Sequence, residues 1–330
     1  MRNIYKIGRS FIEEIKEGEK VAVVHDKDVD GIVSAVLFAR SVEFPVFLIP
    51  FSWKDETIEN EIIEFDIIVT LDLANDVVKK FLPSGRKTLV IDHHPIRESI
   101  NAIIVNPRLV KQDSYKPTSY IVYKMFEEKI SNLKWLAEIG IIADKGVEEC
   151  KDVVEVKGEV WKSRKGTGAK MIAASSVIIG VTETVEKLLS FERLDDLLHD
   201  EEMRSSLKKY EKEIEKCEKE FWKNCMEIEN AVVGIISPEY EGVGSVLSTK
   251  LAEKSKGKII MVITDGNPMR VHGRCNGCDI NIGEMLREIC GGGGHERAGG
   301  GNIKDFDSFV KKIAYYLHRK SRKLGPGKRI

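Results

Sequence analysis

The sequence predicts an α/β protein with a mainly parallel sheet in its N-terminal half and a smaller α/β domain at its C-terminal side. Three observations support this prediction. Apolar runs alternate with helical stretches through the first half, a long charged segment follows, and a second strand–helix pattern begins at Ala231. Alternation of strands and helices is typical of a parallel sheet that helices cover on both faces.

Five short apolar runs predict the strands of the first sheet. KVAVVH (20–25) comes first, and a helix from Gly31 to about Arg40 follows it. The other runs are PVFLIP (45–50), FDIIVTLD (65–72), KTLVID (87–92) and AIIVNP (102–107), with a polar helical stretch at 55–64. Thr118 or Ser119 is a candidate cap for the next helix. A further helix, 135–143, carries Asp144 at its end.

The segment from Phe191 to Glu229 predicts one long helix. Its apolar residues recur every three or four positions among lysines and glutamates, as on a helix that packs one face against a domain: Met203, Leu207, Tyr210, Ile214, Cys217, Phe221, Cys225 and Ile228. A structural connector is the preferred interpretation. The predicted domains are therefore 1–190, a helical connector 191–230, a second domain 231–317 and a basic tail 318–330.

The second domain contains predicted strands AVVGIIS, KIIMVIT and MRVHGR, with a helix near 243–254 after the first of them. Asp279 or Asn281 is expected to cap a helix that runs to Ile289. A glycine-rich loop, GGGGHERAGGG (291–301), and a terminal helix from about Asp305 complete the pattern.

Composition sets the class of protein. With 330 residues, 42% hydrophobic and 32% charged, the chain can bury a sizeable core and is typical of soluble globular proteins. Its net charge of −1 excludes a global basic field, so nucleic-acid binding would need a local patch. No apolar stretch long enough to span a membrane and no signal-peptide pattern are evident, which predicts a cytoplasmic location without membrane contact.

Polar clusters follow the apolar runs of the first half, and they contain the aspartates and histidines that are candidates for catalysis and metal binding. They are HDKDVDG (25–31), VTLD (69–72), VIDHH (90–94) and IIAD (141–144). Ligand sites of open α/β sheets lie beyond the carboxyl ends of the strands. Carboxylates gathered there repel one another unless cations lie between them, and carboxylate with imidazole suits Mn²⁺ or Mg²⁺. The sequence therefore predicts a two-metal phosphoesterase.

Each cluster alone has a structural alternative. An acidic DxDG turn is more often a capped loop, and a lone aspartate at a strand end is usually a helix cap. Only the four clusters together, in this order, favour a metal site. Asp28 and Asp30 can each reach a different ion, whereas His25 and Asp26 are interpreted as residues that orient ligands.

These motifs resemble those of the DHH phosphoesterase superfamily, and GGGGHERAGG resembles the GGGH signature of its accessory DHHA1 domain. The resemblance implies two Mn²⁺ ions, with Mg²⁺ as the alternative, held by Asp28, Asp30, Asp72, His93 and Asp144. It implies that Asp72 bridges the ions and that His94 contacts the scissile phosphate, so both are catalytic. Many members carry a histidine where Val24 stands here. The RecJ-like form fits better, because Asp26 matches its additional acidic residue.

Substrate contacts are expected in the second domain. Successive glycines with nearby His295 and Arg297 can bind phosphate, although such a loop can also be a flexible hinge. The resemblance adds an arginine that contacts the substrate. The candidates are Arg274, Asn276, Gly292, Gly293, Gly294, His295 and Arg297. Cys275 and Cys278 form one CxxC pair, for which reduced thiols, a disulfide and a zinc site are all considered.

The preferred function is a compact, archaeal-type RecJ-like exonuclease that acts on single-stranded DNA or RNA ends or short oligonucleotides and releases nucleoside monophosphates. Digestion from 3′ to 5′ is slightly preferred. The alternatives within the enzyme class are a cyclic dinucleotide phosphodiesterase and a pAp phosphatase. An alternative of another class is a non-catalytic replication or repair subunit. Besides nucleic acid, a homodimer and a replication or repair protein are considered as partners.

Overall fold

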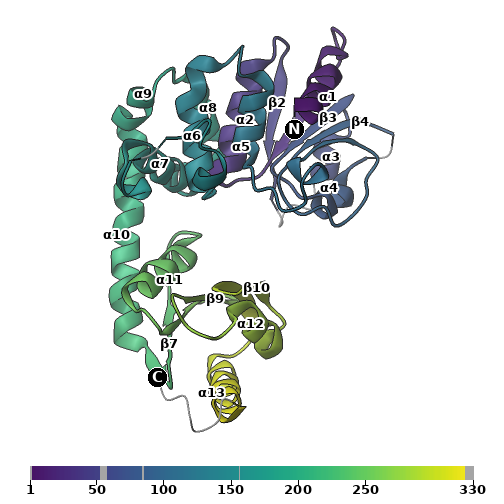
Figure 1. The fold of residues 1–330 in the computed structure, drawn as a ribbon. Coiled ribbons are helices and arrows are strands. Elements are labelled where there is room, and N and C mark those ends of the chain that lie inside the picture. The colour runs from purple at the N-terminus through teal and green to yellow at the C-terminus, as the bar shows by residue number, and fades with distance from the viewer. Residues whose placement is uncertain (1, 53–57, 84, 156, 324–330) are drawn as a thin grey trace. The chain divides into compact units, whose positions relative to one another are not determined.

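The computed structural model describes residues 2–52, 58–83, 85–155 and 157–323, and it divides into two compact units, Met1–Leu207 and Lys208–Ile330 (Figure 1). The boundary between the units falls inside a single helix, α10 (Glu201–Asn224). Each unit has its own sheet and its own hydrophobic core. The predicted α/β class, with a parallel first sheet and a second α/β domain, is confirmed.

The first unit contains a five-stranded sheet in the order β2-β1-β3-β4-β5, and every neighbouring pair is parallel. Its strands are β1 (Val21–His25), β2 (Val46–Pro50), β3 (Ile67–Leu71), β4 (Lys87–Ile91) and β5 (Ile103–Val105). The central strands β1 and β3 are buried along their whole length, as expected of a sheet covered on both faces. The carboxyl ends of β1, β3 and β4 therefore lie side by side at one edge.

Helices cover both faces of this sheet, and the alternation of side chains along each strand assigns residues to the two faces. Val21 and Val23 belong to a large core with residues of eight α-helices: α1 (Arg2–Glu13), α2 (Val29–Ser41), α5 (Thr118–Phe126), α6 (Lys134–Ala143), α7 (Arg164–Ile178), α8 (Val181–Ser190), α9 (Leu194–His199) and the start of α10. Ala22 and Val24 pack on the other face with α3 (Ile58–Ile62) and α4 (Asn75–Phe81). Residues 55–57 of the predicted polar helix lie outside the described residues.

Short 3-10 helices occur in the connections of the first unit. They are η1 (Pro107–Leu109), η2 (Ser131–Leu133), η3 (Val147–Glu149) and η4 (Val160–Lys162). Helix α2 packs against both α5 and α6. This packing matters for the site, because α2 begins immediately after β1, where the first aspartate cluster lies.

The prediction of one continuous helix from Phe191 to Glu229 is wrong. The chain forms α9, breaks at Asp200, and then forms α10. The break has a local cause, since the Asp200 carboxylate accepts a hydrogen bond of 2.8 Å from the Met203 N–H and so caps the new helix. After α10 the chain forms an edge strand, β6 (Met226–Ile228), which pairs with β7 (Ala231–Ile236).

The second unit contains a six-stranded sheet in the order β10-β11-β9-β8-β7-β6. Only β7 and β8 are parallel among its paired strands. The further strands are β8 (Ile259–Thr264), β9 (Met269–Cys275), β10 (Gly293–His295) and β11 (Ala298–Ile303), and the helices are α11 (Val243–Lys254), α12 (Ile282–Cys290) and α13 (Phe306–Lys323). Asn281 caps α12 by accepting from the Glu284 N–H, as predicted. Residues 324–330 of the predicted basic tail lie outside the described residues.

The prediction of a glycine-rich loop at 291–301 is also wrong. These residues form the β10–β11 hairpin, and β11 continues the sheet by pairing with β9. The glycines permit close packing of backbones. A Cβ on Gly283 of α12 would clash with the Gly294 carbonyl, and one on Gly292 would clash with the Gly300 carbonyl. A glycine run thus forms strands here, because its neighbours approach too closely for side chains.

Candidate metal centre

Four of the predicted metal ligands meet at the carboxyl edge of the parallel sheet. Asp72 follows β3, His93 follows β4, Asp30 lies in the first turn of α2, and Asp144 caps the C-terminus of α6. The Nε2 atom of His93 lies 3.3 Å from Oδ1 of Asp72 and 3.5 Å from Oδ2 of Asp144. The structure therefore brings together side chains that are far apart in the sequence. The largest separation, between Asp30 and Asp144, is 114 residues.

These side chains form two overlapping sets of donor atoms. Asp72, His93 and His94 make one set, and Asp30, His93 and Asp144 make the other. Within each set the donor atoms lie within 4.8 Å of one another. Oxygen and imidazole nitrogen donors suit Mn²⁺ and Mg²⁺. The two sets overlap at His93, so their carboxylates lie close enough together to hold a pair of neighbouring ions, although the ring nitrogen of His93 itself can bind only one of them.

Burial and mutual repulsion make this cluster unfavourable without cations. Asp30 and Asp72 are 1% and 3% exposed. Burial raises the pKa of Asp30 well above its usual value, and the charges of Asp72 and Asp144 add to the effect. Burial likewise raises the pKa of Asp72, with Asp28 and Asp92 adding to it. A bound cation would favour the ionised carboxylates, so these residues fit a divalent metal.

Asp72 also has an unusual backbone. Its φ is 62°, in the left-handed region that residues other than glycine rarely adopt. Its backbone N–H donates to the Ile91 carbonyl, which ties the residue to the neighbouring strand. Strained conformations of this kind cluster at functional sites, where the surrounding structure holds them.

His94 lies beside the cluster and is partly exposed. Its Nδ1 atom is 2.7 Å from Oδ1 of Asp92 and 3.9 Å from Oδ1 of Asp72. Burial opposes a charged His94, but the hydrogen bond and the charge of Asp92 outweigh burial and raise the pKa of His94. Because Nδ1 faces Asp92, Nε2 is the ring nitrogen that can face a substrate. The sequence interpretation gave Asp92 no role, although it lies in the same motif.

Asp28 occupies a different environment from the other predicted ligands. Its side chain is exposed, and Oδ1 caps α2 by accepting a hydrogen bond of 2.9 Å from the Gly31 N–H. Asp28 belongs to neither donor set among the described residues. Its charge nevertheless contributes to the raised pKa of Asp72, so it borders the cluster, and its role as a ligand stays a prediction.

His25 and Asp26 shape the turn that leads into α2. His25 is fully buried, and its Nδ1–H donates to the Asp26 carbonyl over 2.7 Å. Burial lowers the pKa of His25 to about 4, so the ring is neutral at physiological pH. Asp26 Oδ1 accepts from the N–H groups of Lys27 and Asp28. Both residues thus fix the backbone that carries Asp28 and Asp30.

Thr118 and Ser119, predicted as helix caps, have another role. The N-cap of α5 is Pro117, which offers no side-chain hydrogen bond. The Thr118 hydroxyl donates to Oδ1 of Asp72 over 3.0 Å, and the Ser119 hydroxyl donates to Asp30. Tyr115 donates to Oδ2 of Asp144 over 2.8 Å. Sequence reasoning missed these contacts because each joins residues far apart in the chain.

The predicted substrate-binding residues lie on the second unit. Arg274 of β9 is half-buried, and its guanidinium donates to Ser245 Oγ over 3.0 Å and to the Gly273 carbonyl over 2.9 Å. Burial lowers its pKa. Asn276, His295 and Arg297 are exposed.

The glycines of β10 and the one that precedes it differ in how tightly they pack. Gly292 and Gly294 are tightly packed, whereas a Cβ on Gly293 would have no atom within 4 Å. Space beside Gly293 is therefore available to a ligand. In the same unit, Cys275 and Cys278 are joined as a disulfide.

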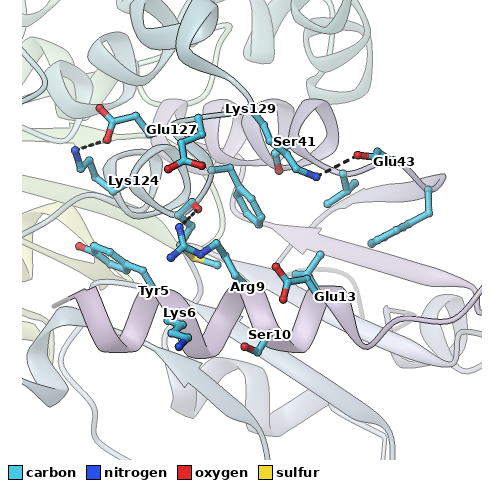
Figure 2. A pocket seen from close by; sticks show the side chains of 16 residues that line it. Tyr5, Lys6, Arg9, Ser10, Glu13, Ser41, Glu43, Lys124, Glu127 and Lys129 are labelled. Carbon is cyan, nitrogen blue, oxygen red and sulfur yellow. Dashed lines mark hydrogen bonds and ion pairs between the residues drawn. The ribbon is translucent and has the colours of Figure 1, made fainter.

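A separate groove lies elsewhere on the first unit (Figure 2). It has a volume of about 830 Å³ and is lined by α1, the end of α2 and the end of α5. Lys6, Arg9, Lys124 and Lys129 are balanced there by four glutamates, Glu13, Glu43, Glu127 and Glu128. None of the predicted site residues lines this groove.

No helix in the described part of the chain combines the length and the apolar character of a membrane-spanning segment.

Comparison with known families matches both units. The model of the DHH family, N-terminal domain, matches residues 20–144, and that of the DHHA1 domain matches residues 232–319. No curated protein sequence matches the chain.

Solved structures share the fold at low identity. RecJ from Thermus thermophilus in complex with Mn²⁺ has a TM-score of 0.74 and 18% identity over 97% of this chain. This chain spans 55% of that RecJ chain. An exonuclease RecJ bound to manganese has a TM-score of 0.70 and 17% identity, with 96% of this chain and 94% of the other covered.

A third solved structure is a pGpG-specific phosphodiesterase, PggH from Vibrio cholerae. It has a TM-score of 0.55 and 17% identity, and the match covers 93% of this chain and all of the other. At such identities these likenesses establish the fold. Together with the two family models, they place the chain among proteins with a DHH-family phosphoesterase fold.

Proposed function

Because this chain belongs to the DHH family and carries a DHHA1 domain, we propose that it is a metal-dependent exonuclease. Its substrates are ends of single-stranded DNA or RNA, or short oligonucleotides, and its products are nucleoside monophosphates. The observation that carries this proposal is the pair of donor sets that share His93, one containing Asp72 and the other Asp30 and Asp144. Exonuclease RecJ structures with the same fold support it.

The metal centre uses Asp30, Asp72, His93 and Asp144, with Asp28 at its border. Two divalent ions held there would supply an activated water and stabilise charge on a phosphodiester. Mn²⁺ is the preferred ion and Mg²⁺ the alternative, which agrees with the Mn²⁺ and Mg²⁺ complexes of the Thermus RecJ. Asp72 would be the carboxylate that bridges the two ions, and its Oδ1 atom, 3.3 Å from Nε2 of His93, supports that assignment.

His94 supplies a contact to the scissile phosphate. Asp92 holds its Nδ1, so Nε2 presents a proton to a phosphate oxygen. The raised pKa of His94 favours the charged imidazolium, which is the form that donates to an anion. This contact stabilises the charge that develops on the phosphate during hydrolysis.

The DHHA1 domain binds the substrate strand in this proposal. Arg297 and His295 are exposed at the end of the β10–β11 hairpin, and Arg274 lies on the adjacent strand β9. A guanidinium pairs well with phosphate, and the open space at Gly293 admits an anion close to the backbone. Asn276, Gly292 and Gly294 complete the proposed contact region.

A panel of substrates tests the proposal. End-labelled single-stranded DNA and RNA of several lengths are incubated with Mn²⁺, beside pAp and cyclic dinucleotides. The expected result is stepwise shortening of the oligonucleotides, with release of monophosphates and a slight preference for the 3′ end. Cleavage of pAp or cyclic dinucleotides alone would replace the exonuclease by one of the alternative activities.

A second candidate is a phosphodiesterase for cyclic dinucleotides or their linear products, or a pAp phosphatase. The likeness to the pGpG-specific phosphodiesterase favours it, because that fold relative covers nearly the same length. A non-catalytic replication or repair subunit is the alternative of another class. The intact cluster of buried Asp30, Asp72 and His93 with half-buried Asp144 argues against that alternative, because buried carboxylates are costly without a metal.

A further inference from the structure

The residues Tyr115 to Ser119 form a short segment that donates hydrogen bonds to three carboxylates of the candidate metal centre. We propose that this positioning segment fixes the orientation of those carboxylates, so that metal affinity depends on side chains that do not touch the metals. The inference rests on the proposed function, since it concerns the same site. It assigns roles to Tyr115, Thr118 and Ser119 that no metal-ligand motif includes.

The first contact is between α5 and Asp30. Helix α5 begins at Thr118, and its N-cap residue Pro117 provides no side-chain acceptor for the first N–H groups. The Asp30 carboxylate, which is distant in the sequence, provides these acceptors instead. Its Oδ2 accepts from the Thr118 N–H over 2.6 Å, and its Oδ1 accepts from the Ser119 N–H over 3.1 Å. The start of a helix favours a negative charge, so this contact favours ionised Asp30.

The hydroxyls of the same two residues extend the contact. Ser119 Oγ donates to Oδ1 of Asp30, and Thr118 Oγ1 donates to Oδ1 of Asp72 over 3.0 Å. All of these groups are buried. Asp72 has a φ of 62°, a strained conformation that persists only where surrounding groups hold the residue. The hydrogen bond from Thr118 is one of the contacts that hold its carboxylate. Thr118 is thus the residue that links the two aspartates.

Tyr115 performs the same task for the third carboxylate. Its hydroxyl donates to Oδ2 of Asp144 over 2.8 Å and also lies 2.9 Å from the Asp144 carbonyl. Its ring packs edge-on against His93, with ring centroids 5.2 Å apart. Tyr115 therefore restrains both members of the His93–Asp144 pair, whose atoms lie 3.5 Å apart.

The segment itself is firmly held. Lys116 is 8% exposed, and its ammonium donates to the Glu149 carbonyl and lies 4.7 Å from the centre of the Tyr120 ring. A Cβ on Gly146 would clash with the Pro117 ring, so backbone packs directly on the proline. A segment fixed in this way can impose geometry on the carboxylates. Groups that orient metal ligands typically change metal affinity or activity by roughly 10-fold to 100-fold when removed.

The test uses the full chain with Tyr115→Phe and Thr118→Val, each of which deletes one hydroxyl. Thr118→Ser serves as the conservative variant that keeps the hydroxyl. The matched controls are Tyr120→Phe, whose hydroxyl donates to Asp152, and Thr184→Val, whose hydroxyl donates to the Gly180 carbonyl. Calorimetric titration gives the Mn²⁺ affinity, hydrolysis gives the Mn²⁺ concentration for half-maximal activity, and thermal unfolding in EDTA gives stability.

We expect Mn²⁺ affinity to fall by roughly 10-fold to 100-fold in Tyr115→Phe and Thr118→Val. Thr118→Ser should remain close to wild type, and both controls should bind Mn²⁺ normally although they lose comparable stability. Wild-type affinity in both test variants, or an equal loss in the controls, would overturn the inference. If one test variant does not fold, the other decides. A wild-type chain that neither binds Mn²⁺ nor hydrolyses phosphodiesters refutes the proposed function instead.

Discussion

Asp72 shows most clearly how single residues define this site. It follows a buried strand, adopts a left-handed backbone conformation, and contacts both His93 and Thr118. Folding raises its pKa, chiefly through burial. A carboxyl group whose pKa is raised stabilises the fold while it is protonated, and that stabilisation is lost as the pH rises through the folded pKa. At neutral pH without metal, Asp72 therefore destabilises the chain.

Replacing Asp72 with Asn tests whether this carboxylate is needed for hydrolysis although it destabilises the metal-free fold. Hydrolysis should fall to background, because the carboxylate proposed to bridge the ions is lost. The metal-free variant should be more stable than wild type at neutral pH, with Tm higher by roughly 2–4 °C for each kcal/mol of relieved repulsion. Mn²⁺ should raise the Tm of wild type more than that of the variant. Asp113→Asn, at an exposed position, is the control; Mn²⁺-dependent activity retained in Asp72→Asn would refute the assignment.

His93→Ala gives an independent test at the same scale, because His93 belongs to both donor sets. Hydrolysis should be lost, and Mn²⁺ titration should show weaker binding, because the ring nitrogen that would coordinate one of the ions is removed. The fold should persist, since the ring lies at the sheet edge and outside the hydrophobic core clusters. Circular dichroism checks the fold. Mn²⁺ affinity equal to that of wild type would show that His93 is not a metal ligand.

His25 provides a prediction about pH. Burial lowers its pKa to about 4, below the unfolded value near 6.5. The stability that neutral His25 contributes is present above pH 6.5 and is lost as the pH falls toward 4, with a full loss of about 3 kcal/mol. Ring-nitrogen NMR shifts of the metal-free protein should show His25 neutral at about pH 6. A titration midpoint near 6.5 would contradict the buried, neutral ring.

Sequence reasoning identified the strand-end residues because strands of a parallel sheet end at one edge, so Asp72 and His93 had to be close. It could not identify Thr118, whose partner Asp30 is 88 residues away. A threonine before an apolar helix also fits an ordinary cap, and local pattern cannot distinguish a cap from a buried donor. Nor could it foresee that Asp28 would be exposed while Asp30 is buried.

At the scale of elements, the strands of the first sheet were predictable because apolar runs of this length, separated by helices, have few other solutions. The structures of the helical connector and of the glycine segment could not be predicted in the same way. In the connector, one aspartate side chain, Asp200, caps a new helix and breaks the apparent continuity. In the glycine segment, propensity favours a turn, but pairing of β11 with β9 and packing on α12 override it.

The contact between α12 and the β10–β11 hairpin gives a matched pair of glycine variants, one on each element. Gly283→Ala places a Cβ against the Gly294 carbonyl and should lower the Tm, because backbone must move. Gly293→Ala has no neighbouring atom within 4 Å and should leave the Tm near that of wild type. If the hairpin binds phosphate as proposed, Gly293→Ala should instead raise KM for oligonucleotides. Equal thermal stability of the two variants would contradict the packing described for β10.

At the scale of the whole molecule, the two units have separate cores, and the candidate metal ligands all belong to the first. Calorimetric unfolding should therefore show two transitions. Mn²⁺ should raise only the transition of the first unit, because a ligand stabilises the unit that binds it. A single transition that shifts as a whole with Mn²⁺ would show that α10 couples the units into one cooperative structure.

Anomalous diffraction from crystals grown with Mn²⁺ tests the central claim most directly, since it locates the ions without relying on activity. We predict two manganese peaks about 3.5–4 Å apart. Both should lie within bonding distance of Asp72, with His93 beside one of them and Asp30 and Asp144 within reach of the other. Crystals saturated with Mn²⁺ that show no peak among these four side chains would contradict the account.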